Sequence, residues 1–211
     1  LRYNLEKQGF RVDEATDAYD SIDWLVKNVP NNNGRVGMTG VSYSGLTAGM
    51  ALLRPHPALK AVSDQASPSD LWMNDDFHRY GALRLSYAFE YAVIEQSGKN
   101  ANALFKFDVY DTYDWYLKLG SVANAQSKLA GPLQAWSDIV SHPDYDAYWK
   151  EQAWAEQLKG TKVPTLTVAG FWDQEDPWGP WQIYSHAEQG DTAGINSIVA
   201  GIKKTGSVNP E

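Results

Sequence analysis

Hydrophobic positions between residues 14 and 28 recur every three or four residues, which is the spacing of one face of an α-helix. The apolar stripe consists of Ala15, Ala18, Tyr19, Ile22, Leu25 and Val26. Asp13 is a suitable N-cap, and Pro30 followed by Asn-Asn-Asn-Gly is typical of a turn. The pattern therefore predicts a helix over 14–28 that buries one face.

Short apolar runs alternate with further helical patterns on either side of the middle of the chain. The expected order is strand 35–39, helix 44–53, strand 59–64, strand 163–169, helix 179–188 and strand 195–200. Strands that alternate with helices are typical of a parallel α/β sheet.

The pattern changes between residues 70 and 155, which hold no convincing strand but much helical, aromatic-rich sequence. The longest helical stretches are expected at 79–95 and 104–119. We interpret this region as a helical insertion. The predicted organisation is an α/β core over 1–69, an insertion over 70–155, and a return to the core over 156–211 that is truncated or altered after 201.

Composition excludes several classes of function. Eighteen Lys and Arg against 26 Asp and Glu give a net charge of −8, which repels nucleic acid and anionic lipid. No apolar run approaches the roughly 18–20 residues that cross a bilayer. The chain has no cysteine, which excludes a thiol nucleophile and thiolate zinc. We therefore expect no nucleic-acid or membrane partner, and no metal or cofactor.

The first residues, from Leu1 to Lys7, do not form a signal peptide, because they are charged and poor in apolar residues. The chain does not begin with Met, which indicates that upstream sequence is missing. The compartment is therefore left open: a periplasmic or secreted protein would carry its signal upstream.

The run Gly-Val-Ser-Tyr-Ser-Gly at 40–45 joins an expected strand to an expected helix. A nucleophile elbow needs a serine on such a turn, with small residues around it so that the backbone can bend. Ser42 would project from the turn, and the amide of Tyr43 at the helix N-terminus would face a developing oxyanion. The alternative is an ordinary glycine-rich turn between a strand and a helix.

A second signal is Phe-Trp-Asp-Gln-Glu-Asp at 171–176, directly after the expected strand 163–169. In α/β-hydrolases the triad acid follows a later strand than the nucleophile, so Asp173 is well placed to orient a catalytic imidazole. Glu175 and Asp176 add carboxylates that a triad does not require. The alternative for these acids is helix capping and solvated charge in the first turn.

The histidines fit the role of general base poorly. His56 and His142 each precede a proline in a turn, and His78 lies in the insertion. His186 lies on the expected helix after the acidic run. A triad histidine is expected after the final strand, and the chain has no histidine beyond Ala200.

These segments together resemble the peptidase S15-like α/β-hydrolase family of α-amino-acid ester hydrolases, cocaine esterase and X-Pro dipeptidyl-peptidases, with the nearest likeness to the first group. The matching segments lie at 17–25, 34–37, 40–45, 75–78, 80–84, 142–149 and 170–176. The resemblance runs from about residue 13 to residue 201. It implies a partial α/β-hydrolase parallel sheet interrupted by a helical cap insertion.

The resemblance also implies roles for individual residues. Ser42 matches the acylated nucleophile, Tyr43 the backbone donor to the oxyanion, and Asp173 the triad acid. Where the family has its triad histidine, in a Gly-Pro-Trp-x-His-Gly stretch, the alignment places Thr205. The family's first strands and the tyrosine that completes its oxyanion hole would precede residue 1.

Asp76, Glu175 and Asp176 match the carboxylate cluster that receives the substrate α-ammonium in the amino-acid ester hydrolases. Three acids can pair with a cation and so orient the adjacent carbonyl toward the serine. The aromatics of the insertion, with Trp72 and Trp178 near the acids, would form an apolar wall.

The lead hypothesis is a serine hydrolase that acts on esters or amides of α-amino acids through an acyl-enzyme, with a small-molecule substrate as its partner. Because the triad histidine is absent, we expect this chain to turn over its substrate poorly. The alternatives are an X-Pro dipeptidyl-peptidase, a non-catalytic fragment that keeps a ligand cleft, and a sugar-binding module suggested by nine Trp and twelve Tyr. The acyl and leaving groups and the oligomeric state stay open.

Overall fold

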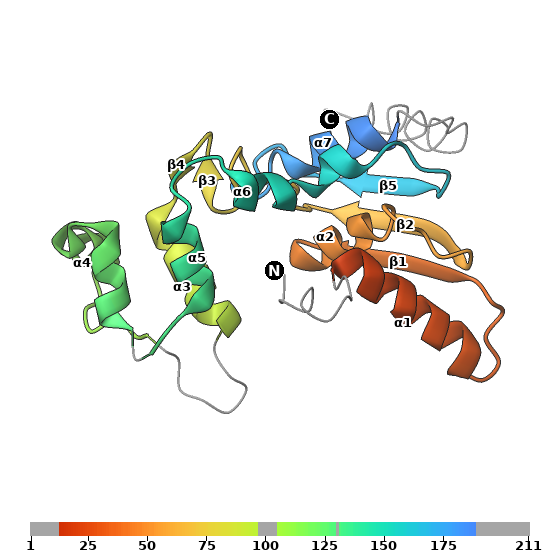
Figure 1. Cartoon of the computed structure of the whole chain (residues 1–211), viewed down its shortest axis with the longest axis horizontal. Helices are drawn as coiled ribbons and strands as arrows, with labels where there is room; N and C mark the ends of the chain where they lie inside the picture. Colours follow the sequence, from red (N-terminus) through yellow and green to blue (C-terminus); the bar gives the residue numbers. More distant parts are fainter. Residues whose placement is uncertain (1–12, 97–104, 130, 189–211) are drawn as a thin grey trace, which may run out of the picture. The chain divides into compact units, whose positions relative to one another are not determined.

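The computed structural model describes residues 13–96, 105–129 and 131–188. The chain forms two compact units, shown in Figure 1. The first unit contains the residues up to Asp70 and those from Gln152 onward, and the second contains Leu71–Glu151. Each unit has its own apolar core.

The first unit is built on a three-stranded parallel sheet in the order β1-β2-β5 (Figure 1). Its elements are α1 (Glu14–Asn28), β1 (Val36–Val41), α2 (Tyr43–Met50), β2 (Leu59–Gln65), the 3₁₀ helix η3 (Trp154–Gln157), β5 (Thr165–Val168) and α7 (Gly179–Ala187). The prediction of parallel strands alternating with helices is confirmed for these elements. The expected strand 195–200 lies outside the described residues.

Helix α1 begins where the sequence predicts. The Asp13 carboxylate accepts hydrogen bonds from the Thr16 amide, 2.9 Å away, and from the Thr16 hydroxyl, 3.0 Å away. The predicted stripe buries Ala15, Ala18 and Ile22, and the last two join the core formed by α2, β2 and the approach to β5. Cap and stripe agree, so the helix forms over the predicted range.

The second unit is mainly helical and aromatic. Its elements are β3 (His78–Arg79), β4 (Ala82–Leu83), α3 (Leu85–Gln96), α4 (Thr112–Leu119), the 3₁₀ helix η2 (Val122–Lys128), α5 (Gln134–Ser141) and α6 (Ala147–Gln152), of which α6 ends one residue past the unit boundary. Its core packs large rings against one another, with Trp72, Phe89, Trp136 and Trp149 all buried. No helix in the described ranges is long and apolar enough to cross a membrane.

The predicted helix 79–95 is wrong in its first part, because residues 78–83 form a short antiparallel hairpin. Tyr80 and Gly81 both have positive φ, 49° and 84°, as in the tight turns that match strand twist. The Arg84 amide continues the pairing by donating to the Phe77 carbonyl over 2.8 Å. The helix therefore starts only at α3, and the expectation of no strand in 70–155 is corrected by β3 and β4.

The predicted helix 104–119 is also shorter in the structure. Helix α4 begins at Thr112, because the Asp111 carboxylate accepts a hydrogen bond from the Asp114 amide and caps the first turn. It ends at Gly120, whose φ of 72° breaks the helical conformation. Local capping at both ends thus determines the length of this helix.

Candidate active site

Ser42 occupies the sharp turn between β1 and α2. Its backbone has φ 61° and ψ −129°, a conformation that non-glycine residues rarely adopt. The turn is held at both ends: the Ser42 amide donates to the Gln65 carbonyl of β2, and the Ser42 carbonyl accepts from the Leu46 amide, each over 2.9 Å. The Ser42 side chain makes no capping bond to α2. A strained serine held by its neighbours is the geometry of a nucleophile elbow.

Two glycines permit this turn. A Cβ at Gly40 would collide with the backbone of Ser44, and a Cβ at Gly45 would lie 2.6 Å from the Gln65 carbonyl oxygen and against the Ser67 hydroxyl. Neither position has room for a side chain. The glycine spacing read from the sequence is therefore required by the close approach of β1, α2 and the end of β2.

Tyr43 is the first residue of α2, so its amide lies in the first turn of the helix, at the N-terminus. The residue is 42% exposed, and its hydroxyl donates to Glu14 of α1 over 3.1 Å. The side chain is thus directed to α1 while the amide stays at the N-terminus of α2. Stabilisation of an oxyanion by this amide remains a prediction.

Asp173 lies in the loop after β5 and is fixed by its own neighbours. One carboxylate oxygen, Oδ1, accepts from the amides of Glu175 and Asp176, over 2.9 and 3.1 Å. Within the described residues Oδ2 has no hydrogen bond. The arrangement holds the carboxylate in place and leaves one oxygen able to accept from an imidazole N–H.

Glu175 and Asp176 follow in the same loop with different exposure. Glu175 is half-buried, whereas the side chain of Asp176 is buried. Because both amides point to Asp173, the three acids form one hydrogen-bonded loop at the end of β5. Their part in binding a substrate ammonium remains a prediction.

The parallel sheet brings the elbow and the acidic loop to the same edge. Ser42 follows β1 and Asp173 follows β5, and β2 lies between these strands (Figure 1). Two strand spacings place the ends of β1 and β5 about 10 Å apart. This is the separation across which an imidazole could hydrogen-bond to groups projecting from both ends.

The histidines of the first unit do not fill that position. His56 precedes β2, so it lies at the opposite edge of the sheet, where Nδ1 accepts from the Ala58 amide over 3.0 Å. His186 on α7 has Nδ1 2.8 Å from the Gln182 carbonyl of its own helix. Within the described residues neither ring bonds to Ser42 or Asp173. Thr205, aligned on the triad histidine, lies outside the described residues.

The histidines of the second unit have structural partners. His78 is buried against the rings of Trp72 and Trp149, and its Nδ1 lies 3.0 Å from the Leu71 carbonyl. His142 Nδ1 lies 2.6 Å from the carboxylate of Asp146. The same carboxylate accepts a hydrogen bond from the Tyr148 amide near the start of α6. Both histidines thus help to hold the aromatic unit together.

Asp76 belongs to the second unit, immediately before the hairpin. It is buried, with 6% of its surface exposed, and its Oδ1 accepts from the Tyr87 hydroxyl over 2.8 Å. Its carbonyl accepts from Arg84 over 2.7 Å. The sequence pointed to Asp76 but gave no indication of these two partners.

A sequence model described as X-Pro dipeptidyl-peptidase (S15 family) matches residues 6–201. The chain belongs to this S15 family. Cocaine esterase from Rhodococcus sp. (strain MB1 Bresler) is 30% identical over 173 residues, which cover 77% of this chain and 30% of the esterase.

Solved structures agree with this assignment. An α-amino acid ester hydrolase is 42% identical with a TM-score of 0.77, covering 89% of this chain and 31% of that one. An aminopeptidase from a marine sediment archaeon, Thaumarchaeota archaeon, is 41% identical with a TM-score of 0.77, covering 83% of this chain and 29% of that one. The chain therefore folds as part of an α/β-hydrolase domain, and it spans about 30% of the length of these relatives, all of them hydrolases.

Sequence reasoning missed Asp64, a fully buried acid in the central strand of this S15 sheet. Its Oδ1 accepts from the Thr167 hydroxyl over 3.0 Å, and its Oδ2 has no partner within the described residues. Burial raises the pKa of Asp64 to about 6. The sequence held one indication of this burial. Asp64 lies two residues after the buried Val62, so the two side chains lie on the same face of β2.

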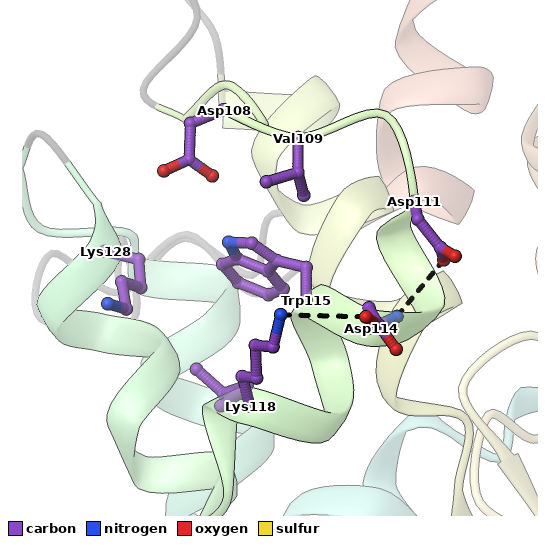
Figure 2. A pocket seen from close by; sticks show the side chains of 8 residues that line it. Asp108, Val109, Asp111, Asp114, Trp115, Lys118 and Lys128 are labelled. Atoms are coloured by element: carbon purple, nitrogen blue, oxygen red, sulfur yellow. Dashed lines mark hydrogen bonds and ion pairs between the residues drawn. The ribbon is translucent and has the colours of Figure 1, made fainter.

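A hollow in the second unit contains none of the predicted site residues (Figure 2). Trp115 lines it, together with the Asp114–Lys118 ion pair of α4, which is 3.6 Å long. Within the described ranges, no group of three or more His, Asp or Glu side chains could hold a metal ion.

Proposed function

We propose that this S15-family chain carries the nucleophile and the acid of a serine hydrolase that cleaves esters or amides of α-amino acids through an acyl-enzyme. The observation that carries the proposal is the strained backbone of Ser42, with φ 61° and ψ −129°, between β1 and α2. Such strain persists only where surrounding structure enforces it, and it clusters at active sites. Here two glycines and the end of β2 enforce it.

The chemistry assigned to these residues follows from their positions. The Ser42 hydroxyl attacks the substrate carbonyl and forms an acyl-enzyme with loss of the alcohol or amine. The amide of Tyr43 stabilises the oxyanion, and Oδ2 of Asp173 is the acceptor for the N–H of a triad imidazole. Without that imidazole the serine proton passes to water. Because the alignment places Thr205 at the histidine, we expect turnover by this chain to be slow.

The acyl group is proposed to carry a free α-amine. Each of Asp76, Glu175 and Asp176 is proposed as a partner for an ammonium through a charge-assisted hydrogen bond. This is supported by the named relatives, since an amino acid ester hydrolase and an aminopeptidase both have substrates of this kind in their names. The family description favours a second candidate, an X-Pro dipeptidyl-peptidase, whose substrates also have a free amino terminus.

The first prediction tests the nucleophile. In a chain completed with the family's triad histidine, a fluorophosphonate probe should label Ser42, because the probe reacts with a serine whose proton a base accepts, and it needs no leaving amine. Mass spectrometry of the tryptic digest should locate the adduct on the elbow peptide. The label should be absent from Ser42→Ala.

Ser44→Ala is the matched control, because Ser44 belongs to the same run and lies on the first turn of α2. It should be labelled as the unsubstituted chain is. Labelling that persists in Ser42→Ala would exclude Ser42 as the nucleophile. A chain that binds amino-acid amides but never takes the label would instead be the non-catalytic fragment.

A further inference from the structure

The carboxylate of Asp76 is held from across the β3–β4 hairpin. Asp76 precedes the hairpin and Tyr87 follows it on α3, and the Tyr87 hydroxyl donates to Asp76 Oδ1 over 2.8 Å. Asp76 is buried and Tyr87 half-buried. The hairpin thus returns the chain so that a residue eleven positions later fixes the orientation of this acid.

Arg84 fixes both partners of that bond. Its guanidinium donates to the Asp76 carbonyl over 2.7 Å and lies 4.4 Å from the centre of the Tyr87 ring. Its amide donates to the Phe77 carbonyl over 2.8 Å, which anchors it at the end of the hairpin. The Tyr87 ring is also supported by Tyr91, on which it stacks at 6.0 Å with an interplanar angle of 10°.

We propose that Tyr87 is a positioning residue that orients the Asp76 carboxylate for the substrate ammonium, with Arg84 holding carbonyl and ring in place. This inference rests on the proposed function. A hydroxyl suits the role because it donates to one carboxylate oxygen and carries no charge of its own. A carboxylate whose rotation is already restricted also loses less entropy when the cation binds.

The experiment measures selectivity for the amine rather than affinity alone. Leucinamide and 4-methylpentanamide differ only by the α-amine, and their dissociation constants can be measured by calorimetry with the whole 211-residue chain carrying Ser42→Ala to prevent turnover. We expect leucinamide to bind more tightly. Tyr87→Phe should reduce this preference about fivefold, the effect of one hydrogen bond, and leave the affinity for 4-methylpentanamide unchanged.

Tyr116→Phe is the matched control. It also deletes a hydroxyl that bonds to α3, but the partners are the Glu90 carboxylate, 3.0 Å away, and the Ser86 carbonyl, 3.4 Å away, and not Asp76. It should leave the preference intact. If Tyr87→Phe behaves like Tyr116→Phe, or weakens both ligands equally, the positioning role is wrong.

Asp76→Asn separates this inference from the proposed function. It should abolish most of the preference for leucinamide. If Asp76→Asn does so while Tyr87→Phe has no effect, the ammonium role of Asp76 stands and the role of Tyr87 is overturned. If the chain with native Asp76 and Tyr87 binds both ligands equally, the ammonium site itself is overturned, and the inference with it.

Discussion

The two units hold their candidate site residues by different means. In the first unit, hydrogen bonds to backbone groups hold the site residues. Ser42 is held by the Gln65 carbonyl and the Leu46 amide, and Asp173 by two amides of its own loop. In the second unit, side chains hold the site residue, because the Tyr87 hydroxyl and the Arg84 guanidinium both donate hydrogen bonds to Asp76. The first unit positions its residues through backbone hydrogen bonds of strands and turns, whereas the second unit uses side chains from the two sides of the β3–β4 hairpin.

This difference has consequences for substitution. A site held by the backbone tolerates changes of most side chains but not a change in the space around the turn. A site held by side chains can lose its geometry through the removal of a single hydroxyl. The following predictions test the first half of that comparison, and the Tyr87 experiment tests the second.

The largest effect is expected at the elbow. Gly40→Ala should lower the free energy of unfolding by about 3 kcal/mol or more, because the new Cβ would overlap the backbone of Ser44. Gly37→Ala is the control in the same strand, since its Cβ would meet nothing closer than the Ala61 carbonyl at 3.9 Å. Urea unfolding monitored by tryptophan fluorescence measures the free energy of unfolding of both variants. Similar midpoints for the two variants would show that the turn is not constrained by its backbone.

A second effect, confined to a window of pH, is expected from Asp64, whose buried carboxyl accepts a hydrogen bond from Thr167 and so links β2 to β5. Its pKa of about 6 lies above the ordinary value of 3.8, so the folded state keeps the proton that the unfolded state releases as pH rises through this window. Its contribution therefore falls between about pH 4 and pH 6, by roughly 3 kcal/mol. Asp64→Asn should remove that part of the pH dependence.

The measurement is urea unfolding at a series of pH values from 4 to 8. Asp20→Asn, at an exposed position of α1, is the control and should keep the pH dependence of the unsubstituted chain. A profile that is the same with and without Asp64 would mean that this carboxyl is ionised as readily in the folded as in the unfolded chain.

The smallest effect concerns strain itself. Ser42→Gly should raise the free energy of unfolding by about 1 kcal/mol, because glycine adopts φ 61° without the steric cost, although it also adds entropy to the unfolded chain. Ser44→Gly, in the first turn of α2, should instead lower it by a few tenths to 1 kcal/mol. Opposite signs from the same substitution two residues apart would establish the strain; equal losses would argue against it.

The sequence by itself determined the features that depend on neighbouring residues. The cap at Asp13 and the stripe it begins predicted α1, and the glycines at 40 and 45 predicted a tight turn around Ser42. The position of Asp173 followed from the strand before it. These features are local, because capping, turn geometry and strand alternation are decided within a few residues of chain.

Tertiary structure alone decided the rest. The hairpin at 78–83 replaced an expected helix because Tyr80 and Gly81 adopt positive φ, and helical periodicity does not reveal that. The partners of Asp76 and Asp64, Tyr87 and Thr167, lie 11 and 103 residues away. Burial, and with it the raised pKa of Asp64, depends on what packs over a residue, and that is a property of the folded chain and not of any local pattern.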